Sequence, residues 1–338
     1  MNSNMKVELK INKGNFKKEL EDLYNLKITS ITFLPEGEDG VLYVVKTENS
    51  QKYLAKFIGV RRDATSDELE KQITFSKILK DRGLDFIVAP IASKNNTVFH
   101  FFDDKPFALF PFIEGKRMKE SGLTDEQIKN IARAFSKLHA VKDWPEDFPQ
   151  EEIRQNDFDD FEARFRILET YNDKSKYAKQ FVELLLPLRN TVLEDVNKFK
   201  QYYDTINFEN KVISHRDPSP GNIIFNSSGK LFIIDWDSIM LARPENDINL
   251  FSNPEYFPQF LKEYTRQTNK KLQFEALAMF RYKWDLESIW ERMETILDND
   301  VADIQKKHEI KEMKLELHEY SKIGGILKEI KETILLTS

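Results

Sequence analysis

Two short segments of the chain carry side chains that are suited to moving a phosphoryl group. The first runs from His215 to Asn222 and includes Asp217, and the second places Asp235 at the end of an apolar run. A carboxylate such as Asp217 can accept or orient the proton of an attacking hydroxyl group, whereas an amide oxygen and a second carboxylate can hold Mg²⁺. Phosphoryl transfer needs both functions, because metal neutralises the phosphate charge while one carboxylate stays beside the attacking oxygen. We therefore interpret Asp217 as the base, and Asn222 and Asp235 as the metal ligands.

The spacing of the two segments is as informative as their residue types. The first has the His-Arg-Asp-x-x-x-x-Asn pattern of a kinase catalytic loop, and the second supplies the aspartate that protein kinases take from Asp-Phe-Gly. Between them, apolar runs at 223–225 and 231–234 flank the turn-forming residues 226–229, which predicts a hairpin that bears both groups. Either segment alone is commonly a turn or a helix cap. Together, at this spacing, they favour a kinase.

The residues up to 113 predict a small lobe rich in β-strands. Three strand-like apolar runs separated by turn-forming residues indicate an antiparallel meander. They cover residues 28–34, 41–47 and 52–58. A helical pattern follows at 66–81, and two further apolar runs lie at 87–92 and 107–113. The loop between the first two strands contains Gly37 and Gly40 without the GxGxxG spacing of protein kinases, so it is either a phosphate cradle or an ordinary hairpin turn.

The residues from 114 onward predict a mostly helical lobe. Thr124 and Gln127 form a capping-box pattern before an apolar stripe that ends near His139, which we interpret as a packed or capping histidine. Further helices are expected at 158–171, 175–203, 254–267 and 272–297. We therefore expect an α+β, bilobal, protein-kinase-like fold. Its β-rich N-terminal lobe (1–113) would bind the nucleotide, and its mostly helical C-terminal lobe (114–338) would carry the catalytic and substrate-binding residues.

The small lobe also offers candidates for holding a nucleotide. Lys56 lies in the third strand-like run, where a phosphate-positioning lysine is expected and needs an acidic partner. Glu70 on the following helix is the preferred partner, with Glu68 as its competitor. The run that precedes the lobe crossing would contact the nucleotide base; its candidates are Phe110, Phe112 and Ile113.

Composition narrows the classes of partner and compartment. The chain of 338 residues has a net charge of −6, which disfavours a nucleic-acid partner and favours cationic small molecules. It contains no cysteine, which fits a reducing compartment and excludes thiolate chemistry. No apolar run approaches the length of a signal peptide core or a membrane span. We expect a cytoplasmic protein with no membrane and no nucleic-acid partner.

Taken together, these residues resemble the aminoglycoside phosphotransferase family of small-molecule kinases, and within it the spectinomycin phosphotransferase branch. The resemblance covers nearly the whole chain, including the Lys56 strand, the Glu70 helix, the loop 215–222 and Asp247. It implies ATP or GTP as phosphate donor, Mg²⁺ as cofactor and a small hydroxyl compound as acceptor. Asp247 would either brace the catalytic loop or cap the next helix. The Pro-Ser-Pro sequence at 218–220 departs from the usual family pattern, which has a histidine before Gly-Asn, and this puts the acceptor in doubt.

The acceptor is expected to be small, because residues 236–246 are too few for the activation segment of a protein kinase. A cationic aminocyclitol or aminoglycoside antibiotic is the first expectation. Choline, ethanolamine, homoserine or a sugar is the alternative, and a catalytically idle binding protein is a third reading. Asp285 and Glu287, in a run where acids and aromatics alternate, are candidates for holding the amines of the acceptor. The same run also fits a helix with one solvated, charged face.

Overall fold

The computed structural model of the protein describes residues 8–35, 40–58, 65–118, 122–170, 176–298, 301, 303–320 and 322–337. Tertiary contacts divide the chain into two compact units. The first comprises Met1–Gln150 and Val212–Leu241, and the second comprises Glu151–Lys211 and Ala242–Ser338. These units are defined by contacts and are not the two expected lobes, whose boundary after residue 113 stays a prediction. No helix among the described residues is long and apolar enough to cross a membrane.

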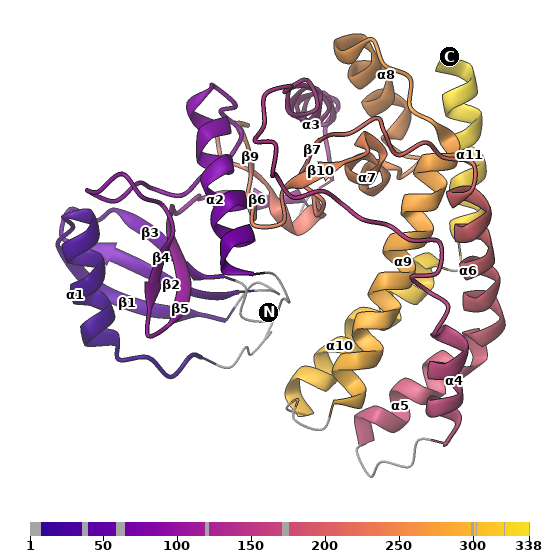
Figure 1. Ribbon diagram of the computed structural model, residues 1–338, viewed down its shortest axis with the longest axis horizontal. Helices are drawn as coiled ribbons and strands as arrows, with labels where there is room; N and C mark the ends of the chain where they lie inside the picture. The colour runs from indigo at the N-terminus through magenta and orange to yellow at the C-terminus, as the bar shows by residue number, and fades with distance from the viewer. Residues whose placement is uncertain are drawn as a thin grey trace. The chain divides into compact units, whose positions relative to one another are not determined.

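The first unit contains a five-stranded antiparallel sheet (Figure 1). Its strands, in spatial order, are β1 (Ile28–Leu34), β2 (Val41–Thr47), β3 (Lys52–Phe57), β5 (Lys105–Pro111) and β4 (His100–Phe102). The expected meander is confirmed, because β1 pairs with β2 and β2 pairs with β3, both antiparallel, and β2 buries alternate side chains. The apolar run at 87–92 forms no strand of this sheet, but Ile87 makes an isolated bridge to Ile233, and Ile91 N donates to the backbone oxygen of Leu109 in β5 at 2.7 Å.

Helices α1 and α2 pack against opposite faces of this sheet, and each contributes to one apolar cluster. Helix α1 (Lys13–Tyr24), which the sequence analysis missed, packs Phe16 and Leu20 against one cluster of buried strand residues. Helix α2 (Ser66–Asp81) covers residues of the other face through Leu69 and Ile73. Each such buried side chain contributes roughly 1.5–3 kcal/mol of hydrophobic free energy. The strand register places Lys56 opposite Leu42 and Ala108, and therefore on the face that α2 covers.

A second β-structure in the first unit carries the two segments that contain Asp217, Asn222 and Asp235. The expected hairpin is present: β8 (Ile223–Phe225) pairs with β9 (Leu231–Ile233), and β6 (Lys116–Arg117) pairs with β8. Strand β7 (Val212–Ser214) pairs with β10 (Met240–Ala242). Helix α3 (Asp125–Leu138) contacts β7 and β9. Its expected capping box is confirmed, because Thr124 and Gln127 exchange two side-chain hydrogen bonds, and His139 is the buried C-cap residue.

The second unit is helical. Its α-helices are α4 (Phe161–Thr170), α5 (Lys176–Leu185), α6 (Arg189–Tyr203), α7 (Pro244–Ile248), α8 (Phe257–Thr268), α9 (Phe274–Leu297), α10 (Asp303–Tyr320) and α11 (Ile323–Thr337). The long helices α6 and α9 lie side by side (Figure 1). The single helix expected at 175–203 is interrupted by a short 3₁₀ turn at Leu186–Leu188, because Pro187 has no N–H for an α-helical hydrogen bond. The α+β class is confirmed, with strands in the N-terminal part and helices in the C-terminal part.

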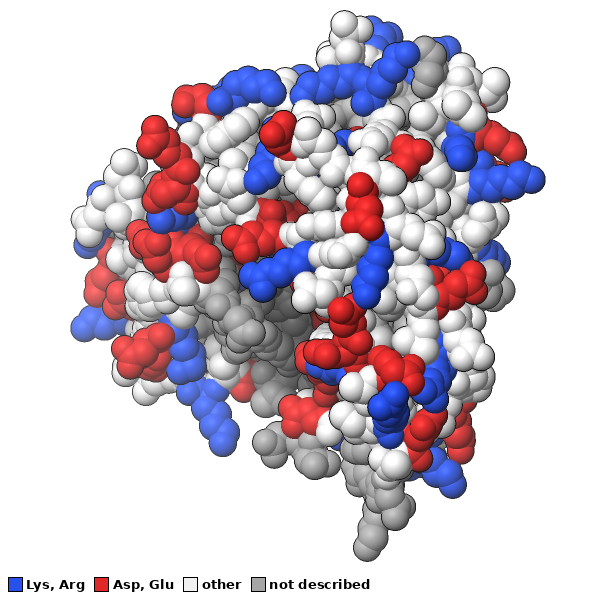
Figure 2. Space-filling view, turned by 45° about the vertical axis from the view of Figure 1, so that its right-hand side comes forward, with Lys and Arg blue, Asp and Glu red and all other residues white. Residues whose placement is uncertain are grey.

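Charged side chains are distributed rather than segregated. Acidic and basic residues are interspersed over the face shown in Figure 2. Several of them form i,i+4 ion pairs along helices, such as Lys77 with Asp81 and Lys198 with Glu194. Exposed pairs of this kind contribute about 0.3–0.5 kcal/mol each. They keep the helix surfaces solvated without setting the fold.

Candidate active site

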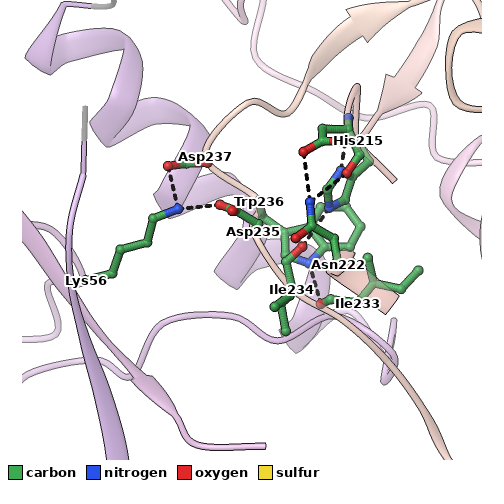
Figure 3. A network of polar contacts seen from close by, with 9 residues as sticks. Lys56, His215, Asn222, Ile233, Ile234, Asp235, Trp236 and Asp237 are labelled. Atoms are coloured by element: carbon green, nitrogen blue, oxygen red, sulfur yellow. Dashed lines mark hydrogen bonds and ion pairs between the residues drawn. The ribbon is translucent and has the colours of Figure 1, made fainter. Parts of the chain in front are cut away.

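The loop between β7 and β8 brings Asp217 and Asn222 into direct contact. Asn222 ends a short 3₁₀ turn that starts at Pro220. Its side-chain Nδ2 donates to the backbone oxygen of Asp217 at 2.9 Å and to Oδ2 of the same residue at 2.9 Å (Figure 3). Because the nitrogen is used in this way, the amide oxygen of Asn222 is the atom that can ligate a metal. The predicted base and the first predicted metal ligand therefore lie side by side.

His215 ties this loop to the segment after β9. Its ring is fully buried, and Nε2 lies 2.8 Å from the backbone oxygen of Ile234. Nε2 must therefore carry the proton and donate, which leaves Nδ1 to accept the backbone N–H of Asp217 at 3.3 Å. The ring also packs edge-on against Trp236, with ring centroids 4.5 Å apart. His215 thus fixes the spacing of the two functional segments, a role that the sequence analysis did not assign.

Two backbone positions in these segments are strained. Arg216 and Asp235 both have φ of 70°. This left-handed conformation is uncommon for residues other than glycine and costs of order 1–3 kcal/mol. Such strain persists only where the surroundings fix it, and here the neighbours His215 and Trp236 are buried. The strain falls on one predicted metal ligand and on the residue next to the predicted base.

Lys56 reaches the second segment from β3. Its buried ammonium forms ion pairs with Asp235 and with Asp237, the latter at 2.9 Å (Figure 3). Burial lowers the pKa of Lys56, but the two carboxylates outweigh it, so the pKa is raised above its ordinary value and the side chain is charged. Gly40 makes room for this lysine, because a Cβ there would lie 2.7 Å from Lys56 Cε and 2.7 Å from the backbone oxygen of Phe57. The other loop glycine, Gly37, lies outside the described residues.

The expected ion pair between Lys56 and Glu70 does not form in the part of the chain that the structure describes. Glu70 is exposed, because it lies about 100° around α2 from Leu69, which faces the sheet. The competitor Glu68 is also exposed and completes a capping box with Thr65. The carboxylates that meet Lys56 come instead from the segment after β9.

The residues expected to contact the nucleotide base lie at the end of β5. Phe110 is buried in the cluster under α2, whereas Phe112 and Ile113 are half-buried. The strand register puts further half-buried apolar side chains on the face that carries Lys56. They are Leu42, Val44 and Leu54. An apolar face that is incompletely covered beside a charged lysine suits a planar base with a phosphate chain.

The candidate acceptor residues lie on α9 in the second unit and already have cationic partners. Asp285 accepts a hydrogen bond from Arg281 Nε at 3.0 Å, and Glu287 accepts from Lys283 Nζ at 2.8 Å. The side chain of Asp285 is only 7% exposed, whereas that of Glu287 is 42% exposed. Of the two, Glu287 is therefore the carboxylate that a solvated ligand can reach.

Comparison with known proteins places the chain in a family. Residues 30–279 match the model of the phosphotransferase enzyme family. The chain belongs to that family. This phosphotransferase uses ATP and transfers phosphate to an alcohol group. The expected resemblance to aminoglycoside phosphotransferases is confirmed, and the resemblance to the spectinomycin branch holds for the fold.

Individual proteins resemble this chain in sequence or in fold. A spectinomycin phosphotransferase, solved in complex with ADP and spectinomycin, superposes with a TM-score of 0.81 at 18% identity, covering 96% of this chain and 99% of that chain. A choline kinase from Streptococcus pneumoniae superposes with a TM-score of 0.56 at 18% identity, covering 93% and 98%. Protein StrN of Streptomyces griseus is 24% identical over 257 residues, which is 70% of this chain and 76% of that protein. The expected protein-kinase-like fold is confirmed.

Sequence reasoning missed Asp237 as a partner of Lys56. The signal was present, because Asp235-Trp236-Asp237 places two carboxylates on either side of an aromatic residue. The indole of Trp236 is buried, and its Nε1 donates to the backbone oxygen of Ile233 at 2.7 Å. Trp236 is buried and the two flanking acids pair with the same lysine, so this tripeptide is a single structural element.

Proposed function

We propose that this phosphotransferase transfers the γ-phosphate of ATP to a hydroxyl group of an aminocyclitol or aminoglycoside antibiotic, with a spectinomycin-like compound as the preferred acceptor. The observation that carries the acceptor proposal is the extent of the similarity to the spectinomycin phosphotransferase, which covers 96% of this chain and 99% of that chain. A superposition over nearly the whole of both chains supports a shared scaffold for an acceptor site, although fold alone does not fix the substrate.

In this proposal Asp217 is the base. Its carboxylate accepts or orients the proton of the acceptor hydroxyl, and the hydrogen bond from Asn222 Nδ2 fixes its orientation. A positioned acid–base group of this kind supplies roughly 10²- to 10⁴-fold in rate. Lys56, with its charge maintained by two carboxylates, would contact the phosphates of the nucleotide.

Asn222 and Asp235 would hold Mg²⁺. Among the described residues there is no cluster of three or more His, Cys, Asp and Glu side chains that could cage a metal. Mg²⁺ at a kinase site does not need one, because it takes one or two protein ligands together with phosphate oxygens and waters. The amide oxygen of Asn222 and the partly exposed carboxylate of Asp235 fit that coordination. When bound, Mg²⁺ would neutralise charge on the transferred phosphate.

A second candidate is a metabolic kinase that acts on choline or a related small hydroxyl compound. The choline kinase superposition over 93% of this chain favours it, although its TM-score of 0.56 is lower than that of the spectinomycin enzyme. Ethanolamine, homoserine and sugars belong to the same alternative. Of the charged acceptors, both antibiotics and choline are cations, and Glu287 is the exposed carboxylate that we propose for holding a cation.

A phosphate-transfer assay with γ-labelled ATP decides between an antibiotic acceptor and a metabolic acceptor such as choline. The purified enzyme is incubated with Mg²⁺ and with spectinomycin, several aminoglycosides, choline, ethanolamine, homoserine or a neutral sugar, and labelled product is quantified. We expect the highest kcat/KM for spectinomycin. A clear preference for choline would select the second candidate, and a preference for homoserine or a neutral sugar would refute the cationic acceptor. The Asp217→Asn variant serves as the background control in every reaction.

A further inference from the structure

We propose that Asp237 is the positioning residue of Lys56, replacing the helix glutamate that was expected to hold this lysine. Lys56 has two carboxylate partners in this structure, and their environments differ sharply. The side chain of Asp235 is 28% exposed, whereas that of Asp237 is 2% exposed. The inference rests on the proposed contact between Lys56 and the nucleotide phosphates.

The difference in exposure indicates different roles for the two aspartates: Asp235 is accessible to a metal ion, and Asp237 holds Lys56. A metal ion with its waters and phosphate ligands can approach only a carboxylate that solvent reaches, and this is Asp235. Asp237 is buried, and its Oδ2 accepts a hydrogen bond from Lys56 Nζ at 2.9 Å. Asp235 can therefore turn to a metal while Lys56 keeps one partner.

A permanent partner is required because Lys56 is itself buried, with 10% of its side chain exposed. An ammonium group taken out of water costs several kcal/mol unless a carboxylate compensates it. Both carboxylates contribute to the raised pKa of Lys56. If Asp235 alone served, metal binding would leave the lysine uncompensated at the moment when its charge is needed.

The position of Asp237 is fixed by its neighbours. Trp236 is buried, its indole donates to the backbone of Ile233, and its ring packs against His215. This anchors the backbone one residue before Asp237. Glu70 cannot take the same role in this arrangement, because it is exposed on α2 and does not contact Lys56.

The test measures binding of ADP by isothermal titration calorimetry, with and without Mg²⁺, for wild type, Lys56→Met, Asp237→Asn and the double variant. We expect Asp237→Asn to weaken ADP binding about tenfold in both conditions, equivalent to about 1.4 kcal/mol. Adding it to Lys56→Met should change nothing further, because it acts through the lysine. Asp67→Asn, which removes an exposed carboxylate paired with a lysine on α2, is the matched control and should bind ADP as wild type does.

Several results would overturn the inference. If Asp237→Asn weakened ADP binding only in the presence of Mg²⁺, Asp237 would act as a metal ligand. If the effects of Asp237→Asn and Lys56→Met on ADP binding were additive, Asp237 would act independently of the lysine. Weakening by Glu70→Gln but not by Asp237→Asn would restore the helix glutamate. If Lys56→Met itself binds ADP normally, the proposed role of Lys56 fails and the inference falls with it. If Asp237→Asn does not give a folded protein by circular dichroism, Asp237→Ser is measured in the same way.

Discussion

Replacing Gly40 with alanine tests whether the position of Lys56 in the proposed nucleotide site depends on the missing side chain at residue 40. A Cβ at this position would lie 2.7 Å from Lys56 Cε, 3.2 Å from Lys56 Cγ and 2.7 Å from the backbone oxygen of Phe57. Both shorter separations are well inside normal van der Waals contact. The φ of Gly40 is not in the left-handed region, so the conflict is steric and not conformational. One of these neighbours must move to admit the Cβ, and the flexible side chain of Lys56 moves more easily than the backbone of β3.

The expected size of the effect follows from these contacts. Overpacking by one methyl group costs typically about 1–3 kcal/mol. Alanine offsets about 0.4–1 kcal/mol of this by reducing the entropy of the unfolded chain. We therefore expect a net loss of about 1–2 kcal/mol in the free energy of unfolding. Displacement of Lys56 from its carboxylates should also weaken ADP binding by roughly fivefold, which corresponds to about 1 kcal/mol.

Urea unfolding and ADP titration measure the two effects. The matched control is Gly122→Ala, since a Cβ at Gly122 would meet nothing within 4 Å. This control should retain wild-type stability and ADP affinity. If Gly40→Ala matched the control in both stability and ADP affinity, the position of the Lys56 side chain would not require a glycine at residue 40. The reasoning would then be wrong.

Four further predictions concern the base, the metal, the acceptor and stability. Asp217→Asn should lower kcat by roughly 10²- to 10⁴-fold with little change in unfolding, because the asparagine oxygen can still accept from Asn222 Nδ2; a variant that kept more than about a tenth of wild-type kcat would exclude Asp217 as the base. Asp235→Ala should lose the Mg²⁺-dependent part of ADP affinity, and equal affinities of variant and wild type with and without Mg²⁺ would contradict metal ligation. Glu287→Gln should raise the KM of a cationic acceptor far more than that of ATP, and high salt should weaken acceptor binding by screening; equal changes in both KM values would argue against a direct contact. Gly325→Ala in α11 should stabilise the protein by about 0.5–1 kcal/mol in urea unfolding, because a Cβ there meets nothing within 4 Å; destabilisation would imply a contact that the helix lacks here.

Several parts of the fold and site follow from the sequence because they depend on neighbours along the chain. The meander at 28–57 reads directly from alternating apolar residues and turn formers, and its observed strands match the expected ones within one residue. The capping box of Thr124 and Gln127 needs only three residues of separation. In the same way, Asp217 and Asn222 meet within a single loop, so their spacing was sufficient to bring them together. Helix α1 was not predicted from the sequence, because only two of its residues, Phe16 and Leu20, are buried.

The partner of Lys56 was decided by tertiary structure. Glu70 was the expected partner because it follows Lys56 closely in sequence, yet the rotation of α2 that buries Leu69 turns Glu70 toward solvent. Asp235 and Asp237 lie 179 and 181 residues from Lys56 along the chain. No local pattern encodes a contact over such separations.

The sequence by itself therefore determined the identity and order of the chemical groups, because the loop 215–222 and the segment 235–237 hold them at fixed short spacings. The tertiary structure decided which carboxylates pair with the ammonium group of Lys56. That choice depends on the tertiary contact between β3 and the segment after β9. There the buried ammonium of Lys56 needs a carboxylate in the interior, and only Asp235 and Asp237, among the described residues, meet it.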